Sequence, residues 1–298
     1  MKLAVIDIGS NAVRFQVTNV ISSADGPLFK KLEYIRFPLR LGHDVFLKGS
    51  ISNLEKERFK KLMQAFKLLL ELYQVDDNMA CATSAMREAA NGHEIVEEVL
   101  TATGLKIHII DGNREASLIN SVIGSQLGNQ VYLHIDVGGG STEINLYDNR
   151  KKIDSKSFRI GSVRSLEKSD STLTWEAMEK WVKRNTKKVK RPLLAVGTGG
   201  NINKVFDLSK KKPGTPLGLK KIKEIQSMIA GYDFDERLKI LQLNPDRADV
   251  IIPAIDIYTS IMKWGKCGKM LVPDAGLKDG MIRYLYEKNV RQEKIEFN

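Results

Sequence analysis

Apolar runs that end in a glycine turn recur along the chain. Residues 3–8 are mostly apolar and suit a buried strand, and the turn residues 9–11 follow them directly. Apolar and polar side chains then alternate over residues 13–18, which is typical of a strand with one buried face. Residues 131–137 repeat the apolar run and residues 138–141 repeat the turn, again with an alternating segment behind them. The pattern predicts two hairpins of the same design.

The two hairpins also share a short sequence. Residues 6–9 (Ile-Asp-Ile-Gly) align with residues 135–138 (Ile-Asp-Val-Gly). Such an internal repeat predicts two similar lobes, each opening with a hairpin whose turn points at a shared cleft. We place the lobes at residues 1–122 and 123–298, and we expect the last helix to pack back on the first lobe.

Helical and strand patterns alternate along the rest of the chain. Ser52 and Glu55 form a capping box, and large apolar side chains follow at three- and four-residue spacing, which predicts a long amphipathic helix. Thr174 is expected to cap another helix, which buries Trp175 and Trp181. Further elements are predicted as a strand at 79–83, a helix up to residue 98, a strand at 105–110, a helix at 114–127 and a strand at 193–196. This alternation is typical of an α/β fold whose sheets are covered by helices.

Composition indicates the cellular compartment of the protein and the charge of its binding partner. With 298 residues, of which 42% are hydrophobic and 28% charged, the chain is long enough for two globular domains. It contains no run of the roughly 20 apolar residues that a membrane helix needs, no signal peptide, and only two cysteines. These features predict a cytoplasmic protein. The formal charge of +11 favours an anionic partner such as a polyphosphorylated molecule.

Three glycine turns that follow apolar strands are candidates for phosphate binding. Glycine lets successive backbone amides approach an anion, and neighbouring hydroxyls can add donors. A single turn of this kind is more often a tight hairpin, but three of them, two preceded by an aspartate, favour a phosphate cradle. None fits the Walker or the dinucleotide-binding pattern. The candidate residues are Ser10, Asn11, Gly138, Gly139, Gly140, Ser141, Thr142, Gly197, Thr198, Gly199 and Gly200.

Three acidic residues lie next to these turns in the sequence, and a fourth, Glu115, follows another strand and glycine. Asp7 and Asp136 end apolar strands, where a lone carboxylate carries a desolvation cost that either Mg²⁺ or the amides of the turn could offset. Glu143 follows the triple glycine. Glu115 begins a predicted helix, where it would either position water or interact with the helix dipole. Position alone leaves these alternatives open.

Short motifs spread over the whole chain carry a family resemblance. They are residues 5–11, 82–89, 112–116, 135–143, 196–200, 247–251 and 276–280. In these motifs the chain resembles the exopolyphosphatase and guanosine pentaphosphate phosphohydrolase family, in its short two-domain form. The resemblance implies a duplicated actin-like, ribonuclease H-like fold with the active site in a cleft between the two domains.

The resemblance also implies roles for individual residues. Glu115, Asp136 and Glu143 would be catalytic, with Glu115 the general base or the carboxylate that positions water. Asp136, Glu143 and Asp7 would hold Mg²⁺, or Mn²⁺ in its place. Arg87 would bind phosphate together with the glycine-turn residues, because a guanidinium fork suits phosphate oxygens. Arg14 departs from the family pattern, which often has an apolar residue or histidine at this position.

The expected reaction is in-line attack of water on the terminal phosphorus of a phosphoanhydride. The expected substrate is inorganic polyphosphate, guanosine pentaphosphate, or both. Two alternatives stay open: a kinase-like phosphotransferase of the actin superfamily, and a basic protein that binds polyphosphate without turnover. We expect neither a membrane nor nucleic acid as a partner, and a homodimer is compatible with the sequence.

Overall fold

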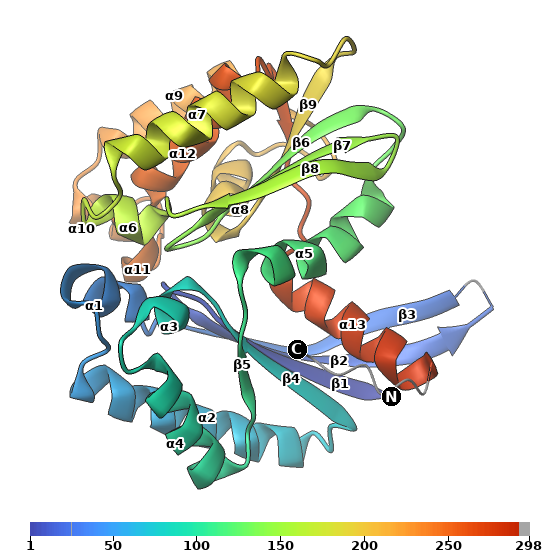
Figure 1. Ribbon diagram of the computed structural model, residues 1–298, viewed down its shortest axis with the longest axis vertical. Helices are drawn as coiled ribbons and strands as arrows, with labels where there is room; N and C mark the ends of the chain where they lie inside the picture. Colours follow the sequence, from blue (N-terminus) through green and yellow to red (C-terminus); the bar gives the residue numbers. More distant parts are fainter. Residues whose placement is uncertain (25, 292–298) are drawn as a thin grey trace. The chain divides into compact units, whose positions relative to one another are not determined.

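The chain forms two compact α/β units, each built around its own sheet (Figure 1). The structure is a computed structural model and describes residues 1–24 and 26–291. Unit 1 comprises Met1–Val122 together with the chain from Gly276 onward, and unit 2 comprises Ile123–Ala275. Among the described residues, no helix is long and apolar enough to cross a membrane.

The sheet of unit 1 has five strands in the order β3-β2-β1-β4-β5. The first three pair antiparallel as a hairpin and its return strand, while β4 and β5 run parallel to β1. Register is fixed by burial, because a shift of one residue would turn every apolar side chain of β1 to the opposite face. The bounds are β1 Lys2–Ile8, β2 Val13–Ser23, β3 Gly26–Phe37, β4 Asp77–Ala82 and β5 Ile107–Ile109.

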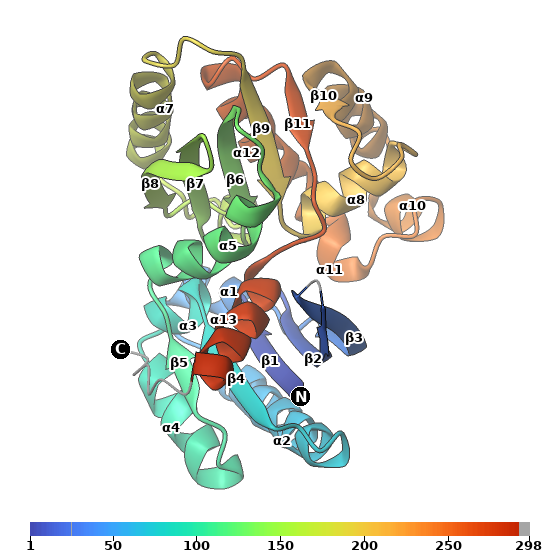
Figure 2. The ribbon, with the colours of Figure 1, turned by 90° about the vertical axis from the view of Figure 1, so that its right-hand side faces the viewer.

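Helices cover both faces of this sheet (Figure 2). One face forms an apolar core in which Ile6 and Phe15 pack with Phe59 and Phe66 of α2 and with Val99 of α4. Helix α13 lies against β1, β2 and β4 on the other face. The helices are α1 Leu41–Lys48, α2 Asn53–Leu72, α3 Ser84–Glu88, α4 Gly92–Thr103, α5 Gly112–Gln126 and α13 Leu277–Arg291.

The sheet of unit 2 has six strands in the order β10-β11-β9-β6-β7-β8. Its central part repeats unit 1, since β6, β7 and β8 form the antiparallel set and β9 runs parallel to β6. The strands are β6 Val131–Val137, β7 Thr142–Asp148, β8 Lys151–Phe158, β9 Leu193–Thr198, β10 Leu217–Gly218 and β11 Lys269–Leu271. The helices are α6 Ser162–Leu166, α7 Thr172–Thr186, α8 Gly200–Leu208, α9 Leu219–Ala230, α10 Phe234–Lys239, α11 Pro245–Ala248 and α12 Ile251–Trp264.

The repeated order of three antiparallel strands followed by helices and parallel strands is the duplicated actin-like fold that the sequence predicts. One face of the second sheet packs on α12, whose buried Ile255 and Tyr258 join Ile135 and Ile144 in a single core. Each strand pair therefore ends in a glycine turn held on a rigid, well-packed support.

Two local predictions were wrong. Helix α7 is capped by Ser171, which accepts a hydrogen bond from the amide of Thr174, so the helix begins three residues earlier than expected. The helix expected up to residue 98 is two helices, α3 and α4. The interruption is held by Asn91, whose side chain accepts from the amide of Ile51 at 3.0 Å and donates to its carbonyl at 2.8 Å. A contact 40 residues away in the sequence thus overrides the local helical pattern.

Candidate active site

The first glycine turn connects β1 to β2 and is anchored to the helices around it. The amide of Gly42 donates to the carbonyl of Ser10 at 2.7 Å, and the amide of Arg40 donates to the carbonyl of Asn11 at 3.0 Å. The hydroxyls of Ser10 and Ser84 lie 2.9 Å apart. Because Ser10 is buried and already paired with Ser84, its hydroxyl serves first to hold the turn on α3.

Asp7, at the end of β1, is held by an arginine. Its Oδ2 accepts a hydrogen bond from Nη1 of Arg14 at 2.8 Å, and the two residues lie directly opposite each other on β1 and β2. The carboxylate is almost fully buried, whereas the arginine side chain is 28% exposed. A guanidinium group of the same sheet therefore helps to offset the desolvation cost of Asp7.

The carboxylates of Glu115 and Asp7 both raise the pKa of one buried thiol, that of Cys81 on β4. Burial raises the pKa of the Cys81 thiol, the carboxylates of Asp7 and Glu115 raise it further, and Arg114 opposes them. Glu115 lies in the first turn of α5 and is itself buried. The structure thus brings two of the predicted acidic residues, Asp7 and Glu115, into one region of unit 1, while Cys81 stays a protonated thiol.

Arg87 lies in the last turn of the five-residue helix α3. Its Nη1 donates a hydrogen bond to the carbonyl of Ile110, at the point where β5 gives way to α5. Asp111 then caps this helix, accepting from the amide of Arg114 at 2.7 Å. Arg87 is half-buried and fixed beside the segment that carries Glu115.

The second glycine turn connects β6 to β7, and helix α6 binds its carbonyl groups. The amide of Ser162 donates to the carbonyl of Gly138 at 2.9 Å, and the amides of Val163 and Arg164 donate to that of Gly139 at 2.8 and 3.0 Å. The carbonyl of Gly140 accepts from Nε of Arg164 at 2.9 Å. Three successive carbonyls of the turn are therefore directed toward α6.

This arrangement sets the direction of the amides. In a trans peptide the N–H points opposite to the preceding C=O, so the amides of Gly139, Gly140 and Ser141 are directed away from α6. Within the described part of the chain, no group accepts a hydrogen bond from the amides of Gly139 and Gly140. Consecutive amides that converge in this way form an anion-binding nest. The hydroxyl of Thr142 is not part of it, because it donates to the carbonyl of Ile160 at 2.6 Å.

Asp136 and Glu143 lie side by side on unit 2. They are directly opposite each other on β6 and β7, so both carboxylates are on the same face of the sheet. Ser157 on β8 donates to Oε1 of Glu143 at 2.8 Å. Burial, then Asp136 and Glu143, raise the pKa of Tyr258 well above its ordinary value, which keeps its phenol protonated next to the two acids.

The third glycine turn joins β9 to α8 and is held by Tyr258. The Tyr258 hydroxyl donates to the carbonyl of Thr198 and accepts from the amide of Val137 at 3.3 Å, which links the ends of β9 and β6. Gly199 has a φ of +113, and a Cβ there would lie 3.0 Å from the Tyr258 hydroxyl and 3.3 Å from Oδ1 of Asp136. Only glycine tolerates both this backbone conformation and this close approach.

A buried histidine, His134, forms a hydrogen bond with the hydroxyl of Thr198. His134 is fully buried, and burial lowers its pKa to about 3, so the ring is neutral. The amide nitrogen of Asn145 donates to Nδ1 at 3.1 Å, which places the ring proton on Nε2, from where it is donated to Oγ1 of Thr198 at 2.9 Å. The Thr198 side chain, predicted from the sequence as a phosphate ligand, therefore points into the interior of unit 2.

Several residues that hold the glycine turns were not singled out from the sequence. Among them are Tyr258 on α12 and Ser157 on β8. Gly161 crosses the triple glycine so closely that a Cβ would lie 2.5 Å from the carbonyl oxygen of Gly139. These contacts join segments far apart in the sequence, and no local pattern marks them.

The carboxylates of unit 2 suit a divalent cation better than Asp7 does. Asp136 and Glu143 offer adjacent hard oxygen ligands, which Mg²⁺ or Mn²⁺ prefers. Asp7 pairs with Arg14, and its predicted role as a metal ligand stays a prediction. Among the described residues, no three Asp, Glu, His or Cys side chains lie close enough together to hold a metal ion by themselves. A cation would thus complete its coordination with substrate oxygens or water.

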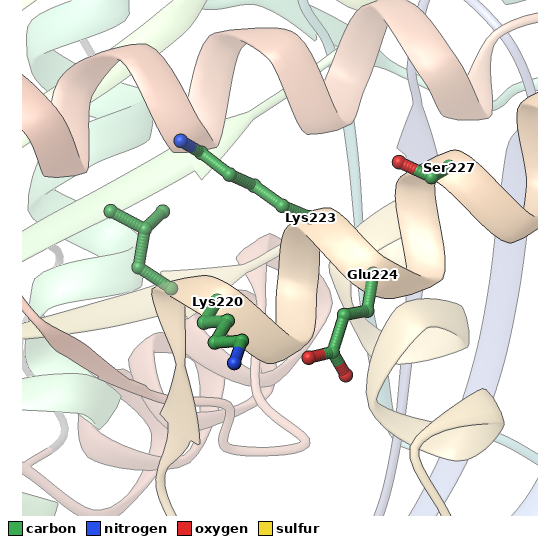
Figure 3. Close-up of a pocket in the computed structure, with 5 residues that line it drawn as sticks. Lys220, Lys223, Glu224 and Ser227 are labelled. Carbon is green, nitrogen blue, oxygen red and sulfur yellow. The ribbon is translucent and has the colours of Figure 1, made fainter.

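Unit 2 also has open depressions on its surface. One, lined by Lys220, Lys223, Glu224 and Ser227 of α9, is shown in Figure 3. The ammonium of Lys220 lies on the same side as the Glu224 carboxylate, whereas Lys223 points the other way. These side chains do not converge on one point.

The fold defines the class as an actin-like α/β protein whose strand ends carry glycine turns. Residues 20–289 match the Ppx/GppA phosphatase family, and the chain belongs to this family.

Three relatives illustrate the match. The chain is 29% identical over 289 residues to the bifunctional 3-dehydroquinate synthase/phosphatase of Fusobacterium nucleatum, covering 88% of this chain and 43% of that protein. It is 24% identical to the guanosine-5'-triphosphate,3'-diphosphate pyrophosphatase of Aliivibrio fischeri, covering 98% of this chain and 62% of that protein. The crystal structure of the Aquifex aeolicus family member superposes with a TM-score of 0.76 at 25% identity, covering 97% and 99% of the two chains. The chain thus spans less than two thirds of these two curated relatives.

Proposed function

We propose that the protein hydrolyses the terminal phosphoanhydride bond of inorganic polyphosphate, of guanosine pentaphosphate, or of both. Family membership supports a phosphatase, since the match covers residues 20–289. The observation that carries the proposal is the second glycine turn. Its carbonyls accept hydrogen bonds from α6, and the amides of Gly139 and Gly140, which have no acceptor among the described residues, would bind the oxygens of a phosphate group.

The proposed roles follow from the environment of each side chain. Glu115 is buried in the first turn of α5, and as a carboxylate it would orient and deprotonate the attacking water. Arg87, fixed on the Ile110 carbonyl, would bind phosphate oxygens through its remaining N–H donors. Phosphoryl transfer needs little covalent help, so positioning and charge neutralisation by such groups account for most of the catalysis.

Asp136 and Glu143 are the proposed ligands of Mg²⁺, with Mn²⁺ as an alternative. When bound, such an ion supplies positive charge to the phosphate oxygens and binds water. Ser157 and Tyr258 hold this end of the sheet in place: Ser157 donates to Glu143, and the Tyr258 hydroxyl joins the ends of β6 and β9. The two acids are therefore presented by a fixed strand pair.

The test is phosphate release from long-chain polyphosphate, tripolyphosphate and guanosine pentaphosphate, each with Mg²⁺. We expect release from at least one substrate, and we expect Glu115→Gln to lower kcat by about 10²- to 10⁴-fold while polyphosphate binding persists. Glu71→Gln, on the exposed surface of α2, is the matched control and should leave kcat unchanged.

Three results would contradict the proposal in different ways. Negligible release from all three substrates, with binding retained, would favour a protein that binds polyphosphate without turnover. Transfer of phosphate to an acceptor other than water would favour the kinase-like alternative. Near-normal kcat in Glu115→Gln would leave the hydrolase intact but remove Glu115 from its mechanism.

A further inference from the structure

Four exposed lysines border one open depression at the edge of the sheet of unit 2. Lys211 follows helix α8, Lys220 and Lys221 begin α9, and Lys269 begins β11, so three separate segments of the chain contribute. Among the described residues that line the depression, Glu224 is the one acid. We call these four lysines the lysine surface.

Backbone pairing brings the segments of the lysine surface together. The edge strand β10 pairs with β11, which places Gly218 opposite Lys269. The amide of Leu219 donates to the carbonyl of Gly268 at 2.9 Å, so the start of α9 is fixed beside the start of β11. Leu217 of β10 is fully buried in the core of unit 2. The lysines therefore stand on a rigid, well-packed support.

The charges of the lysine surface have little compensation. Glu224 pairs with Lys221 at 3.4 Å, but both side chains are about half exposed, so water and salt weaken this pair. Within residues 1–24 and 26–291, no carboxylate pairs with Lys211, Lys220 or Lys269. Lys211 instead donates from Nζ to a neutral backbone carbonyl at 3.1 Å. Three of the four ammonium groups thus carry a charge that no carboxylate neutralises.

The sequence places these lysines where a helix favours acidic residues. Residues 208–223 contain six lysines and no acidic residue. The N-terminus is the positive end of a helix dipole, so acidic side chains are favourable there and lysine is not. Helices α2 and α10 have Glu55 and Glu236 in their first turns, whereas α9 has Lys220 and Lys221 and no acid. The end of α9 therefore adds to the positive potential of the lysine surface.

The lining of the depression suits a phosphate chain better than a nucleic acid. Among the described residues that line it, there is no aromatic side chain and no Arg, Asn or Gln. Single-stranded nucleic acid binds with its bases stacked on aromatic rings, and base edges are bound by Arg, Asn and Gln. Lysine is a point charge that binds phosphate without recognising a base. This chemistry favours condensed phosphate, in which every unit is charged and none is a base.

The lysine surface and the third glycine turn lie toward opposite ends of neighbouring strands. β11 runs parallel to β9 with Met270 opposite Ala195, so Lys269 is level with Leu194, near the start of β9. The glycine turn follows Thr198 at the other end of β9. At about 3.3 Å per residue, roughly 15 Å of strand separates the two positions. A phosphate chain that contacts both must therefore be longer than tripolyphosphate.

We propose that Lys211, Lys220, Lys221 and Lys269 form a second binding surface for long-chain condensed phosphate, separate from the glycine turns. This surface holds a part of the chain that is remote from the reacting end, and short condensed phosphates bind without it. That the bound chain is a substrate rests on the proposed function. The surface itself rests only on the contacts and charges of unit 2.

The test is calorimetric titration of the full-length protein with long-chain polyphosphate and, separately, with tripolyphosphate. EDTA is present, so that binding is measured without a metal ion or turnover, and salt is varied between about 50 and 200 mM. The test variant removes the three lysines that have no carboxylate partner: Lys211→Gln/Lys220→Gln/Lys269→Gln. The control removes the same charge from exposed lysines of β8, at the opposite edge of the same sheet: Lys151→Gln/Lys152→Gln/Lys156→Gln.

We expect the test variant to bind long-chain polyphosphate at least tenfold more weakly than the native protein, and tripolyphosphate within about twofold of it. The slope of log affinity against log salt should become smaller by about 2, since each lost phosphate contact of a single-stranded polyanion removes about 0.7. The control should stay within about twofold of the native affinity for both ligands. Circular dichroism checks the fold, and Lys220→Gln/Lys269→Gln repeats the test if the triple variant does not fold.

Four results would overturn the inference. Native affinity for long-chain polyphosphate in the folded test variant would show that the lysines do not bind it. An equal loss in the control would mean that general charge explains the binding. An equal loss for tripolyphosphate would mean that the lysines belong to the site of the reacting phosphate. Single-stranded DNA of matched charge that binds more tightly than polyphosphate, and loses affinity in the test variant, would make the partner a nucleic acid.

The outcome is separable from the proposed function. Lysine-dependent binding of long-chain polyphosphate by a protein without hydrolase activity would keep the surface and remove the proposed reaction. Active hydrolysis by a protein whose long-chain binding ignores these lysines would do the opposite.

Discussion

At the scale of single residues, the most unusual feature is a fully buried histidine in a β-strand. His134 has a hydrogen-bond partner on each ring nitrogen, Asn145 on one side and Thr198 on the other. The packing of this side chain is therefore polar and directional. The ring holds the Thr198 hydroxyl and so positions the strand end that leads into the third glycine turn.

This burial makes stability depend on pH. The pKa of His134 is about 3 in the folded protein and about 6.5 in the unfolded chain. Between these values the unfolded chain binds a proton that the folded protein excludes, so this contribution to stability is complete above pH 6.5 and declines as pH falls toward 3. We expect His134→Gln, whose amide can both donate and accept, to remove up to about 1.4 kcal/mol per pH unit of this slope.

The measurement is the free energy of unfolding in urea at several values between pH 7.5 and pH 5, a range that limits the influence of carboxylate titration. His93→Gln, at an exposed position of α4, is the control and should keep the native slope. The comparison uses slopes, since the substitution also changes packing at every pH. An unchanged slope in His134→Gln would show that the buried imidazole does not control the acid sensitivity.

At the scale of elements, the short helix α6 has the main effect on the triple-glycine turn. Its first amides bind the carbonyls of Gly138 and Gly139, and the residue that caps it, Gly161, lies against Gly139 and Gly140. A helix N-terminus normally binds an anion or a capping side chain. Here it binds backbone carbonyls instead, and this contact directs the amides of the turn away from the helix.

Gly161→Ala tests this contact. Gly161 has an extended backbone, with φ −158 and ψ 163, which alanine adopts without strain. The added methyl group would nevertheless lie 2.5 Å from the Gly139 carbonyl oxygen and 2.6 Å from the Gly140 amide nitrogen, so the turn must move. We expect kcat/KM on the active substrate to fall by about 10- to 100-fold, since a displacement of about 1 Å can cost 10²-fold.

Gly218→Ala is the matched control. Gly218 also caps a helix with extended backbone, at φ −72 and ψ 144, but nothing lies within 4 Å of its added Cβ. Its kcat/KM should stay near the native value. Native activity in Gly161→Ala would show that the geometry of the triple-glycine turn does not limit the reaction.

The elements also show which parts of the structure can be predicted from the sequence. The repeated strand-turn-strand pattern and the Ser52 cap predict the two sheets and α2, because strand periodicity and capping are local. The gap between α3 and α4 could not be predicted, because it depends on hydrogen bonds between the Asn91 side chain and the backbone of Ile51, 40 residues away in the sequence. The same holds for Tyr258, Ser157 and Gly161. Each acts on a glycine turn through a contact that forms only when distant segments fold together.

At the scale of the whole molecule, the chain returns to its first unit at the end. Helix α13 packs on β1, β2 and β4, and both Lys288 and Asn289 contact Asp77 at the start of β4, at 3.2 and 2.8 Å. Unit 1 is therefore made of two segments separated by all of unit 2. Nearly all of the +11 formal charge lies in residues 123–275, so unit 1 is close to neutral.

The docking of α13 depends on one glycine. A Cβ at Gly280 would lie 2.1 Å from the carbonyl oxygen of Leu118 on α5, which is backbone and cannot rotate away. Helix propensity alone favours alanine over glycine by about 1 kcal/mol. Overpacking costs about 1–3 kcal/mol, and a contact this short with backbone places Gly280→Ala at the upper end of that range. The cost of overpacking therefore exceeds the gain in helix propensity, and we expect a net loss of stability of about 1–2 kcal/mol.

Gly124→Ala separates the two terms, because Gly124 is also helical, in α5, and nothing lies within 4 Å of its added Cβ. Only propensity acts there, so this variant should gain about 0.5–1 kcal/mol. Urea unfolding of both variants, followed by circular dichroism, measures the opposite signs directly. If Gly280→Ala were as stable as Gly124→Ala, α13 would not be packed closely on α5, and the chain after residue 276 would contribute less to unit 1 than its contacts with β1 and β4 imply.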